Sequence, residues 1–145
     1  MLASSILDRK GHEVATVPPD ASITRALDEL ARWNVGALVV SPDGVTVAGL
    51  ISERDIVRRL AGDGVAVLER TVADVMEREV VTVDGRTDSR RLMALMTERR
   101  IRHVPVVEQD RLVGIVSIGD VVKTSVDELT EEATQLADYI RSGGR

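Results

Sequence analysis

Branched aliphatic residues and short polar turns alternate along the chain in an order that occurs twice. Residues 13–40 align without gaps on the stretch that begins at residue 79, and residues 49–57 align on 114–122. The second copy has one residue fewer between its two matched stretches. Self-similarity at a fixed spacing is typical of a repeated structural unit. The pattern therefore predicts two copies of one unit.

Each copy opens with a β-rich run that stops at turn-forming residues. These runs cover residues 14–17 and 80–83, and Pro, Asp or Gly follows each of them. Apolar residues then recur at helical spacing, which predicts one amphipathic helix in each copy. Ser22 and Ser89 are the predicted N-caps of these helices because a serine hydroxyl can accept from the first free amides.

Two short aliphatic runs follow the helix and predict a β-hairpin in each copy. A second helix is expected to begin at Ser52 in the first copy and at Ser117 in the second. The predicted hairpin strands are residues 37–40 with 47–51, and residues 104–107 with 112–116. Each copy thus reads β-α-β-β-α.

A unit of this size cannot bury both faces of its sheet, so the copies are expected to pack sheet against sheet. The predicted fold class is α+β, with two β-α-β-β-α repeats related by a pseudo-two-fold axis and a C-terminal helix. The expected divisions are residues 1–64 for the first repeat with its N-terminal segment, 65–124 for the second, and 125–145 for the C-terminal extension. Residues 65–76 are too apolar for a free linker.

The C-terminal extension has an apolar side whose residues recur in steps of four and three. They are Val122, Val126, Leu129, Ala133, Leu136 and Ile140. This spacing predicts a helix with one apolar seam. The seam could pack on its own domain or contact a second chain, and both interpretations stay open.

Composition narrows the range of functions. The chain of 145 residues has no cysteine, two histidines and a formal charge of -5. Thiolate chemistry and histidine-rich metal sites are therefore not expected, and an acidic chain with two aromatic residues is a poor candidate for binding nucleic acid. Charges by position eight argue against a signal peptide or membrane span. A cytoplasmic protein without a membrane partner is expected.

One short motif occurs in both copies, where a strand ends and a helix begins. It reads Gly, two aliphatic residues, Ser, two variable residues and Asp, at residues 49–55 and 114–120. One interpretation is a capping box, although capping boxes favour Glu or Gln over Asp. The other is a ligand site, in which the carboxylate accepts from the vicinal hydroxyls of a ribose. The helix start would then attract phosphate, and the glycine would let the ligand approach the backbone.

These features together resemble the tandem CBS-domain family, the cystathionine β-synthase type of regulatory repeat. The resemblance rests on both motifs and on the strands Val-Gly-Ala-Leu-Val-Val (35–40) and Ile-Arg-His-Val-Pro-Val-Val (101–107), and it covers residues 1 to about 124. It implies binding of AMP, ADP, ATP, NAD(H) or S-adenosylmethionine between the repeats, and a homodimer. It also implies a regulatory module without catalytic activity or a catalytic cofactor.

The resemblance assigns ligand contacts to two clefts. In one cleft Asp120 would hold the ribose, Ser117 would lie near ribose or phosphate, and the base would contact Ile115, Ala15, Val35, Gly36 and Ala37. In the other, the same roles fall to Asp55, Ser52, Leu50, Val81, Ile101, Arg102 and His103. Because Gly36 and Ala37 align with Arg102 and His103, the two clefts are expected to differ.

The basic cluster at residues 99–103 is divided between two roles. Arg99 and Arg100 are expected to be solvated cations at a helix C-terminus. Arg102 and His103 lie at the strand entrance, where they could clamp a phosphate. Lys10, before the opening strand, is a further candidate for binding phosphate.

The sequence thus favours a sensor of adenine nucleotides, with AMP as the first candidate. The alternative is a dimerisation or interaction module in which both motifs are only helix caps. No nucleophile, base or metal constellation favours an enzyme.

Overall fold

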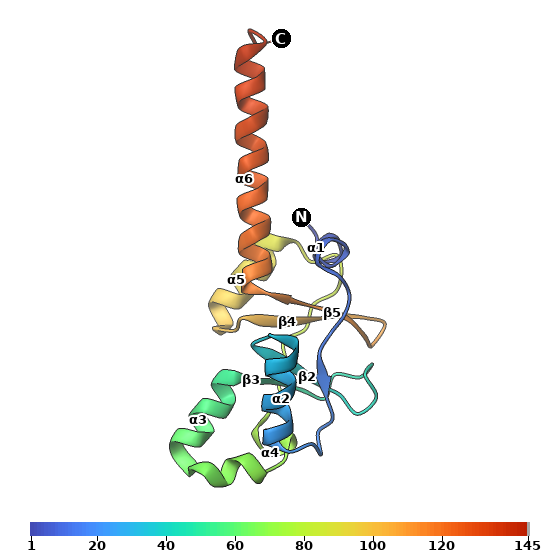
Figure 1. Ribbon diagram of the computed structural model, residues 1–145. Helices are drawn as coiled ribbons and strands as arrows, with labels where there is room; N and C mark the ends of the chain where they lie inside the picture. Colours follow the sequence, from blue (N-terminus) through green and yellow to red (C-terminus); the bar gives the residue numbers. More distant parts are fainter. Residues whose placement is uncertain (145) are drawn as a thin grey trace.

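The strands of the two repeats lie next to each other in the middle of the body, with α3 and α4 on one side and α1, α5 and α6 on the other (Figure 1). The computed structural model describes residues 1–144. Its elements are α1 (Ala3–Lys10), β1 (Thr16–Val17), α2 (Ile23–Trp33), β2 (Ala37–Val40), β3 (Gly49–Ser52), α3 (Glu53–Asp63), the 3₁₀ helix η1 (Val65–Glu69), α4 (Val72–Val75), α5 (Ser89–Arg99), β4 (His103–Glu108), β5 (Arg111–Ser117) and α6 (Ile118–Arg141). The predicted α+β class and the paired repeats are confirmed.

The first repeat has the predicted sheet, in the order β1-β2-β3. Strand β1 is parallel to β2, and β2 is antiparallel to β3. Leu38 and Val40 belong to the core beneath the helices. Val39 alternates with them, so it lies on the opposite face of the strand, and it is also fully buried. Both faces of β2 are therefore covered, as expected for sheets that face each other.

The second repeat differs from the prediction in its opening strand. Residues 80–83 were expected to form a strand, but their only pairing within the described residues is a parallel bridge between Val83 and Val106. In the first repeat the Val39 N–H donates to the Ala15 carbonyl, at 3.1 Å. The aligned residue is Pro105, which has no N–H to donate. The parallel ladder is therefore cut short, and β4 and β5 remain as a two-stranded sheet.

The N-caps also differ between the repeats. Ser22 caps α2 as predicted, and its side chain accepts from the Arg25 N–H. The prediction of Ser89 is wrong: Asp88 caps α5 by accepting from the Arg90 N–H at 2.8 Å, and Ser89 is the first helical residue. Asp88 aligns with Ser22, so the caps occupy equivalent places.

Each hydrophobic core takes a segment from elsewhere in the chain. Ala3, Ile6 and Leu7 of α1 are buried in the core of the second repeat. Val67 of η1 and Val72 of α4 are buried in the core of the first, so residues 65–76 form no free linker. The expected boundary at residue 64 therefore assigns α1 to the first repeat and α4 to the second. In the structure α1 packs in the core of the second repeat and α4 in the core of the first.

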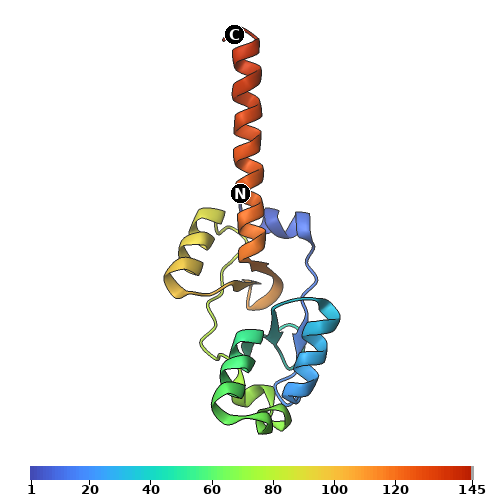
Figure 2. The ribbon, with the colours of Figure 1, turned by 60° about the vertical axis from the view of Figure 1, so that its left-hand side comes forward.

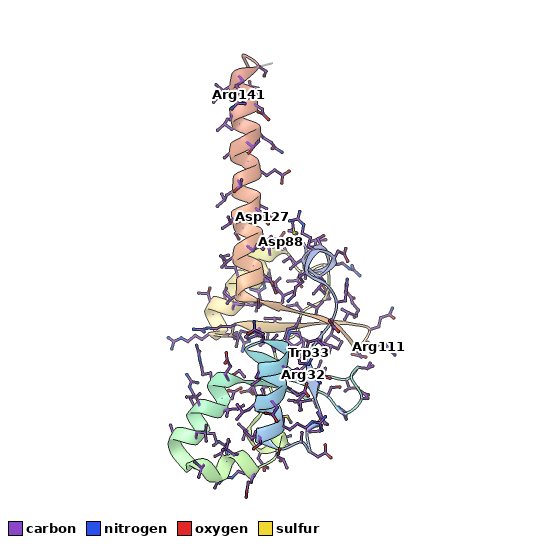
Figure 3. All side chains as sticks on the ribbon, viewed as in Figure 1. Arg32, Trp33, Asp88, Arg111, Asp127 and Arg141 are labelled. Atoms are coloured by element: carbon purple, nitrogen blue, oxygen red, sulfur yellow. The ribbon has the colours of Figure 1, made fainter. Side chains whose placement is uncertain are left out.

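Helix α6 continues well beyond the body as one helix (Figures 1 and 2). Figure 3 shows Asp127 at the level of α1, where the Arg9 guanidinium lies 3.9 Å from its carboxylate, and Arg141 at the far end of the helix. Val126, Leu129 and Leu136 are 55–65% exposed. The interpretation that the apolar seam packs on its own domain is therefore wrong for these residues. Across residues 1–144, no helix has the length and apolar character needed to cross a membrane.

Candidate functional site

Both repeated motifs form the capping boxes that the sequence allowed. Ser52 caps α3, and the Asp55 Oδ2 accepts from the Ser52 N–H and hydroxyl, each at 2.9 Å. Ser117 caps α6, and the Asp120 Oδ2 accepts from the Ser117 N–H at 2.8 Å. The amide of each aspartate donates back to its serine hydroxyl, at 3.2 Å.

These caps use only one oxygen of each carboxylate. Within residues 1–144, Oδ1 of Asp55 and Oδ1 of Asp120 have no hydrogen-bond partner. An aspartate is shorter than the glutamate usual at this place, so its second oxygen stays beside the helix start. The capping interpretation and the ligand interpretation are therefore compatible.

The motif glycines serve packing. The sequence interpretation, that they let a ligand approach, is wrong. A Cβ atom at Gly49 would lie 2.5 Å from the Met76 Sδ and 2.9 Å from the Glu77 carbonyl oxygen. A Cβ atom at Gly114 would lie 2.5 Å from both Cδ atoms of Leu7. The space above each glycine is filled by the chain that enters the repeat.

A cavity of about 250 Å³ surrounds Asp55 at the junction of the two repeats. Six residues of the expected second cleft line it: Leu50, Ser52, Asp55, Ile101, Arg102 and His103. Val81, the seventh, is not among its lining residues. Gly36, which the sequence assigned to the other cleft, lines this cavity as well.

The cavity wall carries charges that the sequence reasoning did not assign. Arg54 and Arg58 come from α3, one turn apart, and Arg100 joins Arg102 from the second repeat. Glu53 and Glu77 provide negative charge beside Asp55. Arg100 is the exposed C-cap of α5, as the sequence analysis expected, and it also lines the cavity. Arg54 and Arg58 could have been predicted from the sequence, because they lie one helical turn apart at the start of the helix that Ser52 caps.

The second carboxylate lies in a different environment. The Lys10 Nζ donates to the Asp120 Oδ2 at 2.6 Å and to the Ile115 carbonyl at 2.8 Å. Both side chains are partly buried, with 31% and 22% exposure. Burial acts to raise the pKa of Asp120, but the hydrogen bond and charge of Lys10 and the Ser117 amide outweigh it, so this pKa is lowered.

The other residues expected beside Asp120 lie in more than one environment. Ala15 is buried in the core of the first repeat, and Ala37 is 4% exposed. Val35 and Gly36 line a separate groove of about 370 Å³ next to α2. Asp120 is not among the residues of that groove.

His103 lies where the tips of the repeats meet. A Cβ atom at Gly36 would lie 3.4 Å from the His103 Cε1 and 3.1 Å from the Glu53 Oε1. Burial lowers the pKa of His103, as do the charges of Lys10 and Arg102, while Asp120 and Glu53 act in the opposite direction. The lowered pKa favours the neutral imidazole at pH 7, which can form a hydrogen bond without carrying a full charge.

Comparisons with known proteins agree with this architecture. The chain is 41% identical over 128 residues to the CBS domain-containing protein CBSX3, mitochondrial, of Arabidopsis thaliana. That match covers 86% of the chain and 62% of the plant protein, so the chain spans less than two thirds of this relative. It is 34% identical over 130 residues to the CBS domain-containing protein YhcV of Bacillus subtilis, covering 90% of the chain and 89% of that protein.

Solved structures show the same fold. The CBS-domain containing protein ATU1752 from Agrobacterium tumefaciens is 44% identical with a TM-score of 0.83, covering 86% of this chain and 99% of that one. The CBS domain pair of protein MJ0100, in complex with 5′-methylthioadenosine and S-adenosyl-L-methionine, is 26% identical with a TM-score of 0.76, covering 86% and 98%. The family description CBS domain matches residues 4–62 and again 72–127, so the chain belongs to the CBS-domain family as a tandem pair.

Proposed function

We propose that the chain is a regulatory module that binds an adenine nucleotide in the cavity around Asp55, with AMP as the first candidate. The observation that carries the proposal is a carboxylate oxygen, Oδ1 of Asp55, that has no hydrogen-bond partner in the described part of the chain and lies in a cavity that four arginines also line. The MJ0100 domain pair, which shares the fold, binds two adenosine compounds.

Each part of a nucleotide has a suitable group in this cavity. Oδ1 of Asp55 can accept hydrogen bonds from ribose hydroxyls, which favours a ligand that contains a ribose. Leu50 and Ile101 offer aliphatic surface for the base. Arg54 and Arg58, with the arginines at 100 and 102, can balance a phosphate.

The size of the cavity favours a mononucleotide. Sites for small ligands usually enclose about 300–1,000 Å³, and this cavity, at about 250 Å³, lies just below that range. ADP, ATP and NAD(H) stay candidates, and each is larger than AMP.

Isothermal titration calorimetry with AMP, ATP and NADH tests the proposal. Asp55→Asn is expected to weaken AMP binding by at least tenfold. Asp74→Asn is the matched control, because Asp74 occupies the same place in the capping box of α4 and does not line the cavity. A chain that releases no binding heat with any of the three ligands would support the alternative, an interaction module without nucleotide. Turnover of a nucleotide would contradict the regulatory role.

A second copy of the chain is the proposed protein partner, with the cytoplasm as the proposed compartment. The support for the partner is the apolar seam of α6, whose residues Val126, Leu129 and Leu136 are largely exposed. Their spacing is that of helices that pack lengthwise against each other.

A further inference from the structure

Helices α1 and α4 enter the two repeats in the same way but differ in length. Each begins with two backbone hydrogen bonds to the turn before the first helix of its core: Val72 to Ala21 and Ala73 to Pro19 in one, Ala3 to Thr87 and Ser4 to Gly85 in the other, at 2.7–2.9 Å. Met76 then fills the space above Gly49 as Leu7 does above Gly114. Helix α4 ends at Val75, whereas α1 continues to Lys10. Lys10 therefore lies on a helical turn that has no counterpart near Asp55.

The ammonium of Lys10 joins Asp120 and Ile115, the residues that the resemblance assigned to the ribose and to the base of a nucleotide in the Asp120 cleft. It donates to the Ile115 carbonyl and to the Asp120 carboxylate. In the other repeat, the carbonyl that aligns with Ile115 is that of Leu50, and it accepts from the backbone N–H of Glu77 at 2.8 Å. A side chain thus replaces a backbone pairing, and its charge lies next to the carboxylate.

The Asp120 cleft also lacks most of the cations that surround Asp55. In the alignment of the repeats, three of the four cavity arginines are replaced by uncharged residues. Arg54 aligns with Gly119, Arg100 with Asn34, and Arg102 with Gly36. Lys10 is the cation that touches Asp120, and the contact already neutralises it. A nucleotide phosphate at this cleft would have far less positive charge to bind.

We infer that Lys10 closes the Asp120 cleft to nucleotides, so that each chain binds one adenine nucleotide, in the cavity around Asp55. The inference rests on the proposed function. A ribose that entered the second cleft would meet a carboxylate whose charge the partly buried Lys10 ammonium already neutralises, and two oxygen acceptors hold that ammonium in place. At Asp55 the competing donor is the Ser52 hydroxyl, which is uncharged and can rotate away.

The stoichiometry of AMP binding to the full chain tests this inference. Calorimetry is expected to give one site per chain for the wild type and loss of that site in Asp55→Asn. Lys10→Met keeps the length of the side chain without its charge and is expected to expose a second site. Asp120→Asn, added to Lys10→Met, is expected to remove that second site again.

Three results would overturn the inference. They are two equal sites in the wild type, one site that survives Asp55→Asn, and a Lys10→Met variant that still binds a single nucleotide. Lys10→Gln replaces Lys10→Met if circular dichroism shows that the latter is unfolded. Absence of binding by every variant would instead remove the proposed function, and this inference with it.

Discussion

Replacing Gly114 by alanine tests the packing that the motif glycine permits. The added methyl carbon would lie 2.5 Å from both Cδ atoms of Leu7, whereas carbon atoms pack best at about 3.5–4.0 Å. Leu7 is 1% exposed, so it has no free space to enter, and α1 must move away from β5. Overpacking of a filled core costs about 1–3 kcal/mol, which corresponds to a Tm lowered by about 3–10 °C for a chain of this size.

Thermal unfolding followed by circular dichroism measures this effect. Gly119→Ala is the matched control, because a Cβ atom there meets only the Ser117 Oγ, at 3.6 Å. Gly119 lies in the first turn of α6, where alanine is more favourable than glycine by about 0.5–1 kcal/mol. The control is therefore expected to raise the Tm slightly. A Gly114→Ala variant as stable as the wild type would refute the assignment of this glycine to packing against Leu7.

Three further predictions concern other parts of the molecule. Burial lowers the pKa of His103 below 6.5, so the folded state binds fewer protons than the unfolded state, and the contribution of His103 to the free energy of unfolding is complete above pH 6.5 and decreases below it. His103→Asn should flatten this dependence of the unfolding free energy on pH in denaturant titrations, and an unchanged dependence would contradict the prediction. The backbone N–H groups of Thr46 and Val45 and the Thr46 hydroxyl lower the pKa of Asp43 to about 2. The stabilisation of the turn by the Asp43 carboxylate is therefore complete above pH 3.8 and lost as the pH falls towards 2, and an Asp43 titration by NMR with a midpoint near 3.8 would argue against these hydrogen bonds. Leu136→Glu should shift a dimer towards monomer in sedimentation velocity, Gln135→Glu should not, and an equal effect of both would exclude the α6 seam.

Much of the fold could be predicted from the sequence, because strand and helix periodicity is a local signal. The hairpins and the helix starts at Ser52 and Ser117 agree with the structure. The shortened strand at residues 80–83 depended on its neighbour: Pro105 withholds a hydrogen bond from a strand more than 20 residues away. The exchange of α1 and α4 between cores is a matter of tertiary packing, which a repeat pattern does not specify.

The site divides along the same line. Asp55 and Ser52 were predicted because the motif is contiguous, and Ile101 and Arg102 because the family resemblance assigned them to the same cleft; both lie just before β4. Arg54 and the other helix arginines were missed because a charge on a helix surface is usually only solvated. The ion pair of Lys10 with Asp120 joins residues 110 apart in sequence, so no local pattern could reveal it.

The most direct test of the central claim is a comparison of AMP with its 2′-deoxy and 3′-deoxy analogues on the wild type and on Asp55→Asn. A hydrogen bond to a charged group contributes about 1.5–3 kcal/mol, so loss of a hydroxyl held by Oδ1 should weaken binding to the wild type by about ten- to a hundredfold. Asp55→Asn should discriminate far less among the three ligands. Equal affinity of the wild type for all three would contradict the assignment of Asp55 to the ribose.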